Sequence, residues 1–260
     1  MWDRTRTLGE LGWLLFLRDF RIRFRQTFFG SLWAIVQVLL SYLPLVFVGS
    51  QIGLAGDRDP RRYALHSLLG LLIWQMFWDG LFSPQWIGRR MRGLLSEAAF
   101  PPESILVAGA SYAFYNAAIY VVVILAAFPM LRIAPPASLA LGILAVPLVI
   151  LAGVAVGLWV VPLTFVYLDF RYALPMLSPL LMWTAPILYD EPSSGALRWA
   201  NRINPLTYIV DAPRDWFSTG WQPEEVAFPI AMLVSLALLI LGLRFYRSAM
   251  PRVIECLPKR

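Results

Sequence analysis

Few side chains in this 260-residue chain have the types and spacing that catalysis needs. His66 is the single histidine, Cys256 the single cysteine and Lys259 the single lysine, and the sequence contains no G-x-x-x-x-G-K-[ST] phosphate-binding loop. A phosphate-binding loop needs a lysine inside the fold, and a metal site needs several ligands at fitting spacing. We therefore expect no catalytic residue, no metal site and no cofactor bound by this chain.

Two groups of carboxylates remain as candidates for chemistry. Asp57 and Asp59 flank one residue, as in the metal-binding aspartate pair of sugar-nucleotide transferases, but such pairs are also common in turns. Asp79 falls within a predicted membrane span, where a carboxylate normally has a partner. Alternatively, Asp79 lies in the headgroup region beside Arg89 and Arg90.

The densest group of cations lies near the N-terminus and leads directly into an apolar segment. Four arginines fall within eight residues, and no charged residue follows them until Asp57. At helical spacing Arg18, Arg21 and Arg25 share one face, opposite an apolar one. This pattern predicts an amphipathic interface helix over 8–27 that lies on the membrane surface. Its guanidinium groups match phosphate geometry, so they are candidates for binding a lipid phosphate or for docking a partner.

The composition indicates an integral membrane protein. Hydrophobic residues make up 59% of the chain and charged residues 15%, with a mean hydropathy of +0.64. A soluble domain averages about 25% charged residues. The apolar runs are long and continuous, which favours helices over the alternating strands of a barrel. We expect an all-α integral membrane protein, with a single transmembrane domain over 1–260. Its six transmembrane helices are predicted at 28–52, 63–85, 104–131, 137–166, 173–189 and 226–243.

The two longest segments between these spans are expected to hold short helices. In the loop 86–103 a helix should end near Phe100, because the prolines that follow cannot continue it. Residues 190–225 alternate apolar and charged side chains, which predicts two amphipathic helices broken at Asn204-Pro205. These two helices would form a partly re-entrant outer hairpin between spans five and six. Residues 167–172 are expected to be a short loop.

The distribution of Lys and Arg predicts the orientation of the chain. The N-terminal segment, the loops 86–103 and 167–172 and the C-terminal tail hold 15 of these residues, and the opposite loops hold seven. Cytoplasmic loops carry an excess of Lys and Arg. We therefore expect a multi-pass protein with both termini in the cytoplasm.

A polar stripe runs along the first predicted span. Trp33, Gln37, Ser41 and Pro44 recur at helical spacing and so share one face. Such a stripe is typical of a surface that faces protein or a water-filled path, although ordinary helix packing explains it equally well.

Short motifs that occur in order along the chain resemble one family. They are Arg18-Asp19, Arg25-Gln26-Thr27, Gly30, Leu32-Trp33, Phe100-Pro101, Asp169-Phe170-Arg171, Pro186-Ile187-Leu188-Tyr189 and Asn204-Pro205-Leu206. With the six predicted spans, this set resembles the permease subunit of ABC-2 type transporters that export lipid-linked polysaccharides such as O-antigen, capsule or teichoic acid. The chain departs from the family pattern at Phe24, where tyrosine is frequent, and at the doubled Pro101-Pro102.

The resemblance implies a homodimer in a bacterial cytoplasmic (inner) membrane, joined to two copies of a cytoplasmic ATPase that binds ATP and magnesium. It also implies a cytoplasmic coupling helix that ends at Phe100-Pro101, a channel lined by the first and fifth spans, and outer gate helices within 194–218. Membrane lipids are expected neighbours, and nucleic acid is not an expected partner. The candidate residues in this scheme are Trp33, Gln37, Ser41, Tyr42, Ser178 and Met182 for the substrate path; Arg18, Arg21 and Arg25 for lipid phosphate or the interface; Ser96, Glu97, Phe100 and Pro101 for ATPase coupling; and Trp199, Asn204, Pro205 and Tyr208 for the outer gate.

Other functions remain open at this point. An ABC-2 exporter of a drug or a lipid would have the same spans. A membrane-bound glycosyl- or acyltransferase would need carboxylates or a histidine near a membrane surface, for which Asp79, His66 and the pair Asp57 and Asp59 are the candidates. A membrane scaffold without transport is the third alternative.

Overall fold

The computed structural model describes residues 2–24, 33–53, 59–91, 93, 101–189, 195–220 and 227–255. These residues form nine helices and, within the described part, no strand, so the all-α prediction is confirmed for them. The helices are α1 (Trp2–Phe24), α2 (Trp33–Gln51), α3 (Pro60–Arg90), α5 (Glu103–Leu131), α6 (Leu139–Val166), α7 (Leu168–Met182), α8 (Ala196–Ile203), α9 (Pro205–Ser218) and α10 (Ala227–Glu255).

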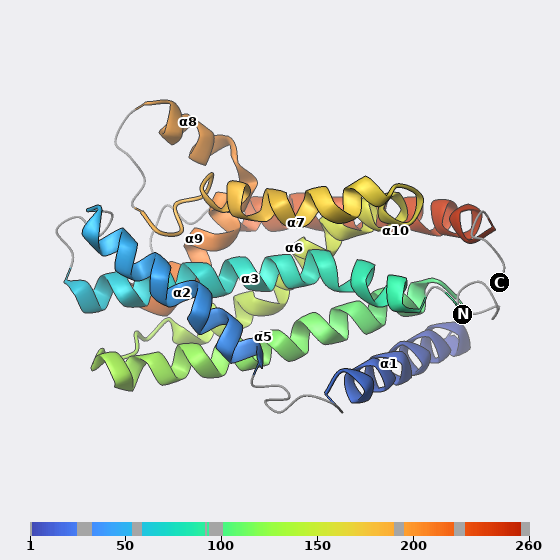
Figure 1. Cartoon of the computed structure of the whole chain (residues 1–260), viewed down its shortest axis with the longest axis horizontal. Helices are drawn as coiled ribbons and strands as arrows, with labels where there is room; N and C mark the ends of the chain where they lie inside the picture. The colour runs from blue at the N-terminus through green and yellow to red at the C-terminus, as the bar shows by residue number, and fades with distance from the viewer. Residues whose placement is uncertain are drawn as a thin grey trace.

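Helix α3 forms the centre of the bundle, with α5 and α6 packed along it and α2 crossing in front of it in Figure 1. Its side chains are buried on nearly every side between Tyr63 and Gly88. A helix enclosed in this way faces other helices and not lipid, so it can carry polar residues such as Gln75 and Asp79 inside the bundle.

Small residues allow α3 and α6 to approach closely. A Cβ atom added to Gly153 would meet the Phe77 carbonyl oxygen, and one added to Gly80 would meet the Ile150 carbonyl oxygen. Gly157, one turn beyond Gly153, lies in the same way against Leu81. The G-x-x-x-G pair is therefore a helix-packing face, as its spacing indicates.

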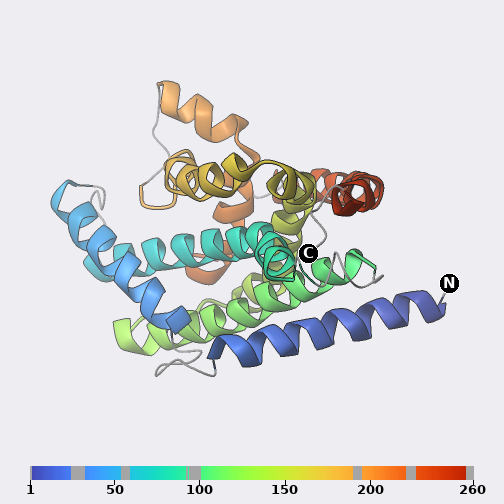
Figure 2. The same cartoon turned by 45° about the vertical axis from the view of Figure 1, so that its right-hand side comes forward.

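The described chain begins and finishes at the same end of the bundle. The starts of α1 and α5 and the ends of α3 and α10 lie at this termini end, and the ends of α2 and α5 and the start of α3 lie at the opposite, far end (Figure 1). Figure 2 shows the same grouping after rotation, with α1 lying along α5.

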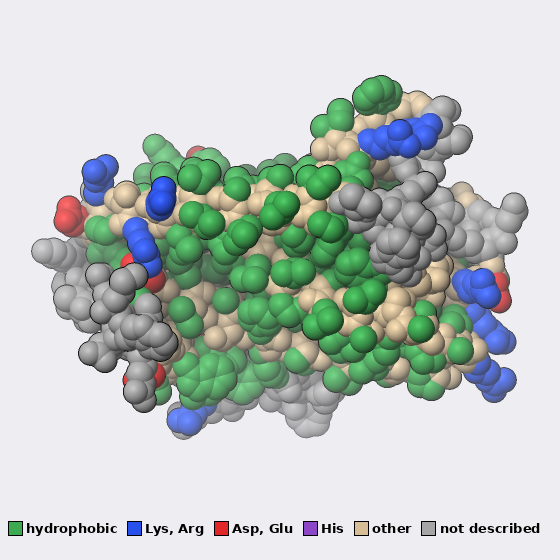
Figure 3. Space-filling model, turned by 180° about the vertical axis from the view of Figure 1, so that it is seen from behind, with side chains coloured by type: hydrophobic (Ala, Val, Ile, Leu, Met, Phe, Trp, Pro, Cys, Tyr) green, Lys and Arg blue, Asp and Glu red, His purple; other side chains and the backbone are tan. Residues whose placement is uncertain are grey.

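An apolar belt separates the two charged ends. Figure 3 shows hydrophobic side chains over the middle of one face, with Arg, Asp and Glu gathered toward both ends. Among the described residues, α5, α6 and α10 are each long and apolar enough to cross a membrane by length and composition. The fold is that of a helical membrane protein.

Several boundaries differ from those predicted. Residues 167–172 are not a loop, because Tyr167 is the single extended residue between α6 and α7, and the helix resumes at Leu168. Helix α7 ends at Met182, so the predicted fifth span is helical for only part of its length; the prolines of this region disfavour a continuous helix.

Other helices are longer than predicted or shifted along the chain. Helix α3 continues to Arg90 and α10 to Glu255, which places parts of the expected coupling loop and C-terminal tail inside helices. The first helix is described over Trp2–Phe24, so it begins before the predicted residue 8. The predicted end of this helix, 25–27, and the predicted start of the first span, 28–32, lie outside the described residues. Helices α8 and α9 meet at Asn204, where the sequence places the break.

Candidate functional site

Helix α2 has one face in the bundle and one outside it. Trp33 and Pro44, which bound the polar stripe, are exposed. Tyr42 is buried, and its hydroxyl donates a 2.7 Å hydrogen bond to the carbonyl oxygen of Ala64 on α3. Nine residues separate Trp33 from Tyr42, which is about 180° around a helix. Tyr42 therefore belongs to the α2–α3 contact and not to the outward stripe; the side chains of Gln37 and Ser41 lie outside the described part.

Helix α7 is exposed along most of its length. The face that it turns toward the bundle is the i, i+4, i+8 row of Leu174, Ser178 and Met182, of which Met182 is buried. Ser178 and Met182 therefore lie on the packed row of α7, and their role in a substrate path stays a prediction. Met176, 74% exposed, lies on the outward surface.

Helix α1 is attached to the bundle at its middle. Gly12 lies against Val107 of α5. The ring of Phe20 packs edge-on against the ring of Tyr115, with 4.9 Å between the ring centres. Asp19 is buried, whereas its neighbours Arg18 and Arg21 are exposed.

The exposed arginines of α1 border a shallow hollow. Leu14, Leu17 and Ile22 line this hollow of about 410 Å³ together with Arg18 and Arg21. The sequence predicts a cationic and an apolar side for this helix, and the hollow combines the two. Arg25 lies outside the described residues.

The end of the predicted coupling segment is fixed to α10. Ser96, Glu97 and Phe100 lie outside the described residues, and Pro101 is half-buried. The buried Tyr246 hydroxyl donates a 2.9 Å hydrogen bond to the carbonyl oxygen of Pro102, and Arg247 pairs with Glu103 at 3.2 Å. Movement of this segment would therefore act on α10 as well as on α5. Nothing in the sequence pattern indicates this connection, because the pairs are more than 140 residues apart.

At the far end, α8 and α9 are tied to the chain that follows α7. The Asn204 side chain accepts a bond from the Leu206 backbone N–H, which caps α9, and donates a 2.9 Å bond to the Thr184 hydroxyl. The Tyr208 hydroxyl donates to the Arg202 carbonyl oxygen at 2.7 Å. Pro205 is the first residue of α9. Proline fits this position because its missing N–H has no helical partner there.

Trp199 on α8 differs from the other gate candidates. Its ring is 71% exposed. An indole this exposed on an amphipathic helix is suited to a membrane–water interface or to a partner surface.

A polar cluster lies inside the bundle around Asp79. The carboxylate accepts hydrogen bonds from the Asn116 amide at 2.8 Å and the Tyr120 hydroxyl at 3.0 Å, both on α5, and from the Gln75 amide at 3.4 Å. Asp79 is thus held between helices and has the kind of partner that the sequence leads us to expect. The sequence analysis did not identify Asn116 as the partner of Asp79. The only indication was that Asn116 is a polar amide within a predicted span that carries no charge.

The contacts of the remaining candidates for catalysis are those of residues that stabilise the fold. The Asp59 carboxylate accepts a 2.9 Å bond from the Arg61 backbone N–H and caps α3, and Asp57 lies outside the described residues. His66 is buried near the start of the same helix. Within the described part of the chain, no group of three His, Cys, Asp or Glu residues could hold a metal ion.

The structure is a helical bundle with an apolar belt, helices long enough to span a membrane, and exposed α2 and α7. These features define the class as a multi-pass membrane protein. Residues 10–218 match the family described as ABC-2 type transporter, so the chain belongs to this family. The ABC-2 membrane domain is a transport permease that is not itself catalytic, and such domains generally work with ATP-binding partner subunits. Comparison with curated proteins gives no match.

Proposed function

We propose that this chain is the permease subunit of an ATP-driven exporter of lipid-linked polysaccharide, working as a homodimer with two ATPase subunits. In this proposal six helices cross a bacterial cytoplasmic membrane, both termini are cytoplasmic, and the path runs between α2 and α7 of two protomers. Membership of the ABC-2 family supports the transport role.

The observation that carries the proposal is the exposure of α7. Its 15 residues extend about 22 Å, which is shorter than a hydrocarbon core of about 30 Å. The chain that completes the crossing, Trp183–Tyr189, is not a regular helix. Non-helical backbone at membrane depth is tolerated where it is covered by protein or lines a water-filled cavity. Residues 185–188 of this segment are buried within the protomer and so meet the first condition, whereas the outward surface of α7 is left to be covered by a second protomer or to border the path.

The outward face of α2 supports the same arrangement. Leu40 and Phe47 are 64% and 68% exposed, and they lie near Trp33 and Pro44 on the helix circumference. An apolar surface of this kind is covered by lipid or by a second copy, and the stripe that includes Gln37 gives it polar positions that fit a path.

The exposed aromatic rings favour a glycan as cargo. Trp33, Tyr172 and Trp183 are 43%, 61% and 44% exposed on the two helices assigned to the path and in the segment that follows α7. Rings with a polar edge give a sugar chain flat apolar contacts and hydrogen bonds in one surface. The arginines of α1 would bind the lipid phosphate before transfer, since guanidinium groups bind phosphate in a bidentate manner.

Transport would be driven from the termini end. ATP binding would close the ATPases and move the segment around Ser96, Glu97 and Phe100. The connection of Pro102 to Tyr246 would pass this movement to α10, and the attachment of α1 to α5 would pass it to α1, which precedes α2 in the chain.

Cross-linking tests the homodimer. In a Cys256→Ser background, Leu40→Cys combined with Met176→Cys should give a covalent dimer on mild oxidation. Val122→Cys, equally exposed on α5 at 62%, is the matched control and should stay monomeric. Equal cross-linking of the control, or none with the α2–α7 pair, would contradict the proposed interface.

An ATPase assay tests the cargo. The chain purified with its partner ATPase should hydrolyse ATP faster when lipid-linked glycan is added and should not respond to drug-like amphiphiles. Arg18→Gln, Arg21→Gln and Arg25→Gln together should impair this response while the protein still inserts. Stimulation by drugs or by lipid alone would favour the other ABC-2 cargo, and turnover by the isolated chain would favour an enzyme.

A further inference from the structure

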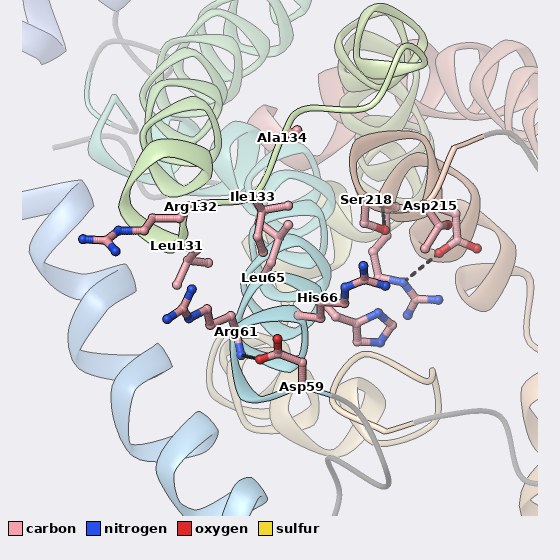
Figure 4. A pocket seen from close by; sticks show the side chains of 13 residues that line it. Asp59, Arg61, Leu65, His66, Leu131, Arg132, Ile133, Ala134, Asp215 and Ser218 are labelled. Atoms are coloured by element: carbon pink, nitrogen blue, oxygen red, sulfur yellow. Dashed lines mark hydrogen bonds and ion pairs between the residues drawn. The ribbon is translucent and has the colours of Figure 1, made fainter.

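A pocket of about 890 Å³ opens at the far end of the bundle (Figure 4). It is bordered by the start of α3, the turn after α5 and the end of α9. The cationic side chains in its lining are Arg61, Arg62, Arg132 and Arg214, and the apolar ones include Leu65, Leu131 and Ile133.

One of the four arginines is already neutralised. Arg214 is 7% exposed, pairs with Asp211 at 3.0 Å and Asp215 at 3.4 Å, and donates to the Pro186 carbonyl oxygen. Its charge is therefore used to hold α9 in place. Figure 4 shows Asp215, one of the two carboxylates that pair with this arginine, at the edge of the pocket.

The other three arginines are exposed at the pocket mouth. Arg61 and Arg62 come from the first turn of α3, and Arg132 comes from the turn after α5, so two distant parts of the sequence supply one cationic surface. None of the three forms an ion pair with another described residue. The nearby Asp59 oxygen accepts the Arg61 backbone N–H. The lining thus has an excess of positive charge that an anion would balance.

The backbone at Arg132 gives independent support for a role of its side chain. Arg132 has φ 58° and ψ 41°, the left-handed conformation that ends α5, and it is the one described non-glycine residue with positive φ. Glycine is the usual residue at this position of a helix end because a Cβ atom is disfavoured there. An arginine at this position makes the backbone less stable than glycine would. Binding of an anion by its guanidinium group would explain why arginine is found there.

We propose that this pocket binds the phosphate of a membrane lipid headgroup at the far end of the bundle. The three guanidinium groups supply bidentate donors for the phosphate, and Leu65, Leu131 and Ile133 supply apolar contact for the glycerol and the first acyl carbons. In Figure 3 charged side chains at this end directly border the apolar belt, which is the depth of a headgroup. The apolar side chains beside the arginines would contact a lipid but not free phosphate, so we expect a lipid.

The test measures the thermal unfolding midpoint of the full chain, delipidated in detergent, with phosphatidylglycerol, phosphatidylcholine or inorganic phosphate added. Phosphatidylglycerol should raise the midpoint most, and inorganic phosphate should have little effect. Arg132→Gly suits its backbone conformation, so the lipid-free protein should be at least as stable as the original. Its apparent affinity for phosphatidylglycerol should nevertheless fall about fivefold, as expected for one basic residue at an anionic lipid surface.

Two further variants separate the pocket from general charge effects. Arg62→Gln should weaken the lipid response in the same way as Arg132→Gly. Arg252→Gln removes the same charge from the exposed surface of α10 at the termini end and should leave the response unchanged. Native mass spectrometry should show one phosphatidylglycerol fewer retained by Arg132→Gly. An undiminished lipid response in Arg132→Gly, an equal loss in Arg252→Gln, or an equal response to inorganic phosphate would each overturn the proposal.

Discussion

Asp19 of α1 and Arg90 at the end of α3 form an ion pair with a 3.1 Å separation, although they are 71 positions apart in the sequence. The Asp19 side chain is 7% exposed, and the Arg90 guanidinium also lies 4.0 Å from the centre of the Trp86 ring. This pair fixes the C-terminal part of the amphipathic helix to the central helix of the bundle. The same helix bears the arginines assigned to lipid phosphate, so the pair determines where they lie.

Separating Asp19 from Arg90 should loosen α1. Arg90→Gln leaves a buried carboxylate without its cation, and Asp19→Asn removes the need for that cation. A double-mutant cycle should therefore give a coupling energy of about 1 kcal/mol in detergent unfolding, since Arg90 is partly exposed. Arg18→Gln, on the exposed side of the same helix, should change stability by less than about 0.5 kcal/mol. A coupling energy of zero would mean that α1 is held by its apolar face alone.

The glycine seam between α3 and α6 should tolerate no added methyl group. Gly153→Ala would bring Cβ onto the Phe77 carbonyl oxygen and force the two helices apart, with an expected loss of about 1–3 kcal/mol. Gly9→Ala on α1 meets no atom within 4 Å and should raise stability by up to about 1 kcal/mol through helix propensity. Unfolding of the two variants measured side by side checks this contrast. Similar changes in stability for the two variants would show that the close approach of α3 and α6 does not determine stability.

The sequence predicts the helices better than the faces that they present. Long apolar runs correctly place most of the residues of α5 and α6, because the membrane requires continuous helices there. The position of Tyr42 was also within reach of helical periodicity, which puts it opposite Trp33. Whether either residue borders a substrate path stays a prediction.

Contacts between distant segments could not be predicted from apolar runs or helical periodicity. Asp79 needed a partner, but nothing local indicates that Asn116 and Tyr120 of α5 supply it. The beginning of α7 depends on one extended residue, Tyr167, which composition does not distinguish from its neighbours. The far-end pocket combines arginines from two turns, and their convergence depends on how α3 and α5 pack.

The Asp79 cluster should contribute to the association of α3 and α5. Asn116→Ala removes the shortest bond to the carboxylate, at 2.8 Å, and should cost about 1–2 kcal/mol, as polar contacts between membrane helices do. Tyr120→Phe should cost less, because the remaining amides still reach the carboxylate. Ser111→Ala is the control, since its hydroxyl bonds within its own helix to Val107. A loss for Ser111→Ala as large as that for Asn116→Ala would contradict a special role for the cluster.

Asn204 has two separable functions at the junction of α8 and α9. Its oxygen caps α9 and its amide donates to Thr184. Asn204→Asp keeps the cap and loses the donor, whereas Asn204→Ala loses both. We expect Asn204→Ala to cost about 1–2 kcal/mol and Asn204→Asp to cost less. Both variants should expose this junction to proteolysis, which is the direct readout of the lost Thr184 contact. Resistance of Asn204→Asp equal to the original would assign the whole effect to the cap.

The hydrogen bond from Tyr246 to Pro102 should matter more for coupling than for stability. Tyr246→Phe keeps the buried ring and removes one 2.9 Å bond, so unfolding should change by about 1 kcal/mol. In the proposed transporter the Pro102 carbonyl oxygen adjoins the segment that contacts the ATPase, and its release from α10 should lower the cargo exported per ATP hydrolysed. Arg247→Gln breaks the neighbouring, more exposed pair with Glu103 and should have a smaller effect on this ratio, because exposed ion pairs contribute little. The measurement is export and ATP hydrolysis in the same proteoliposomes, with both variants at equal protein density. If Tyr246→Phe lowers both rates in proportion, the bond serves assembly with the ATPase and not the transmission of movement, since a transmission defect must change the ratio.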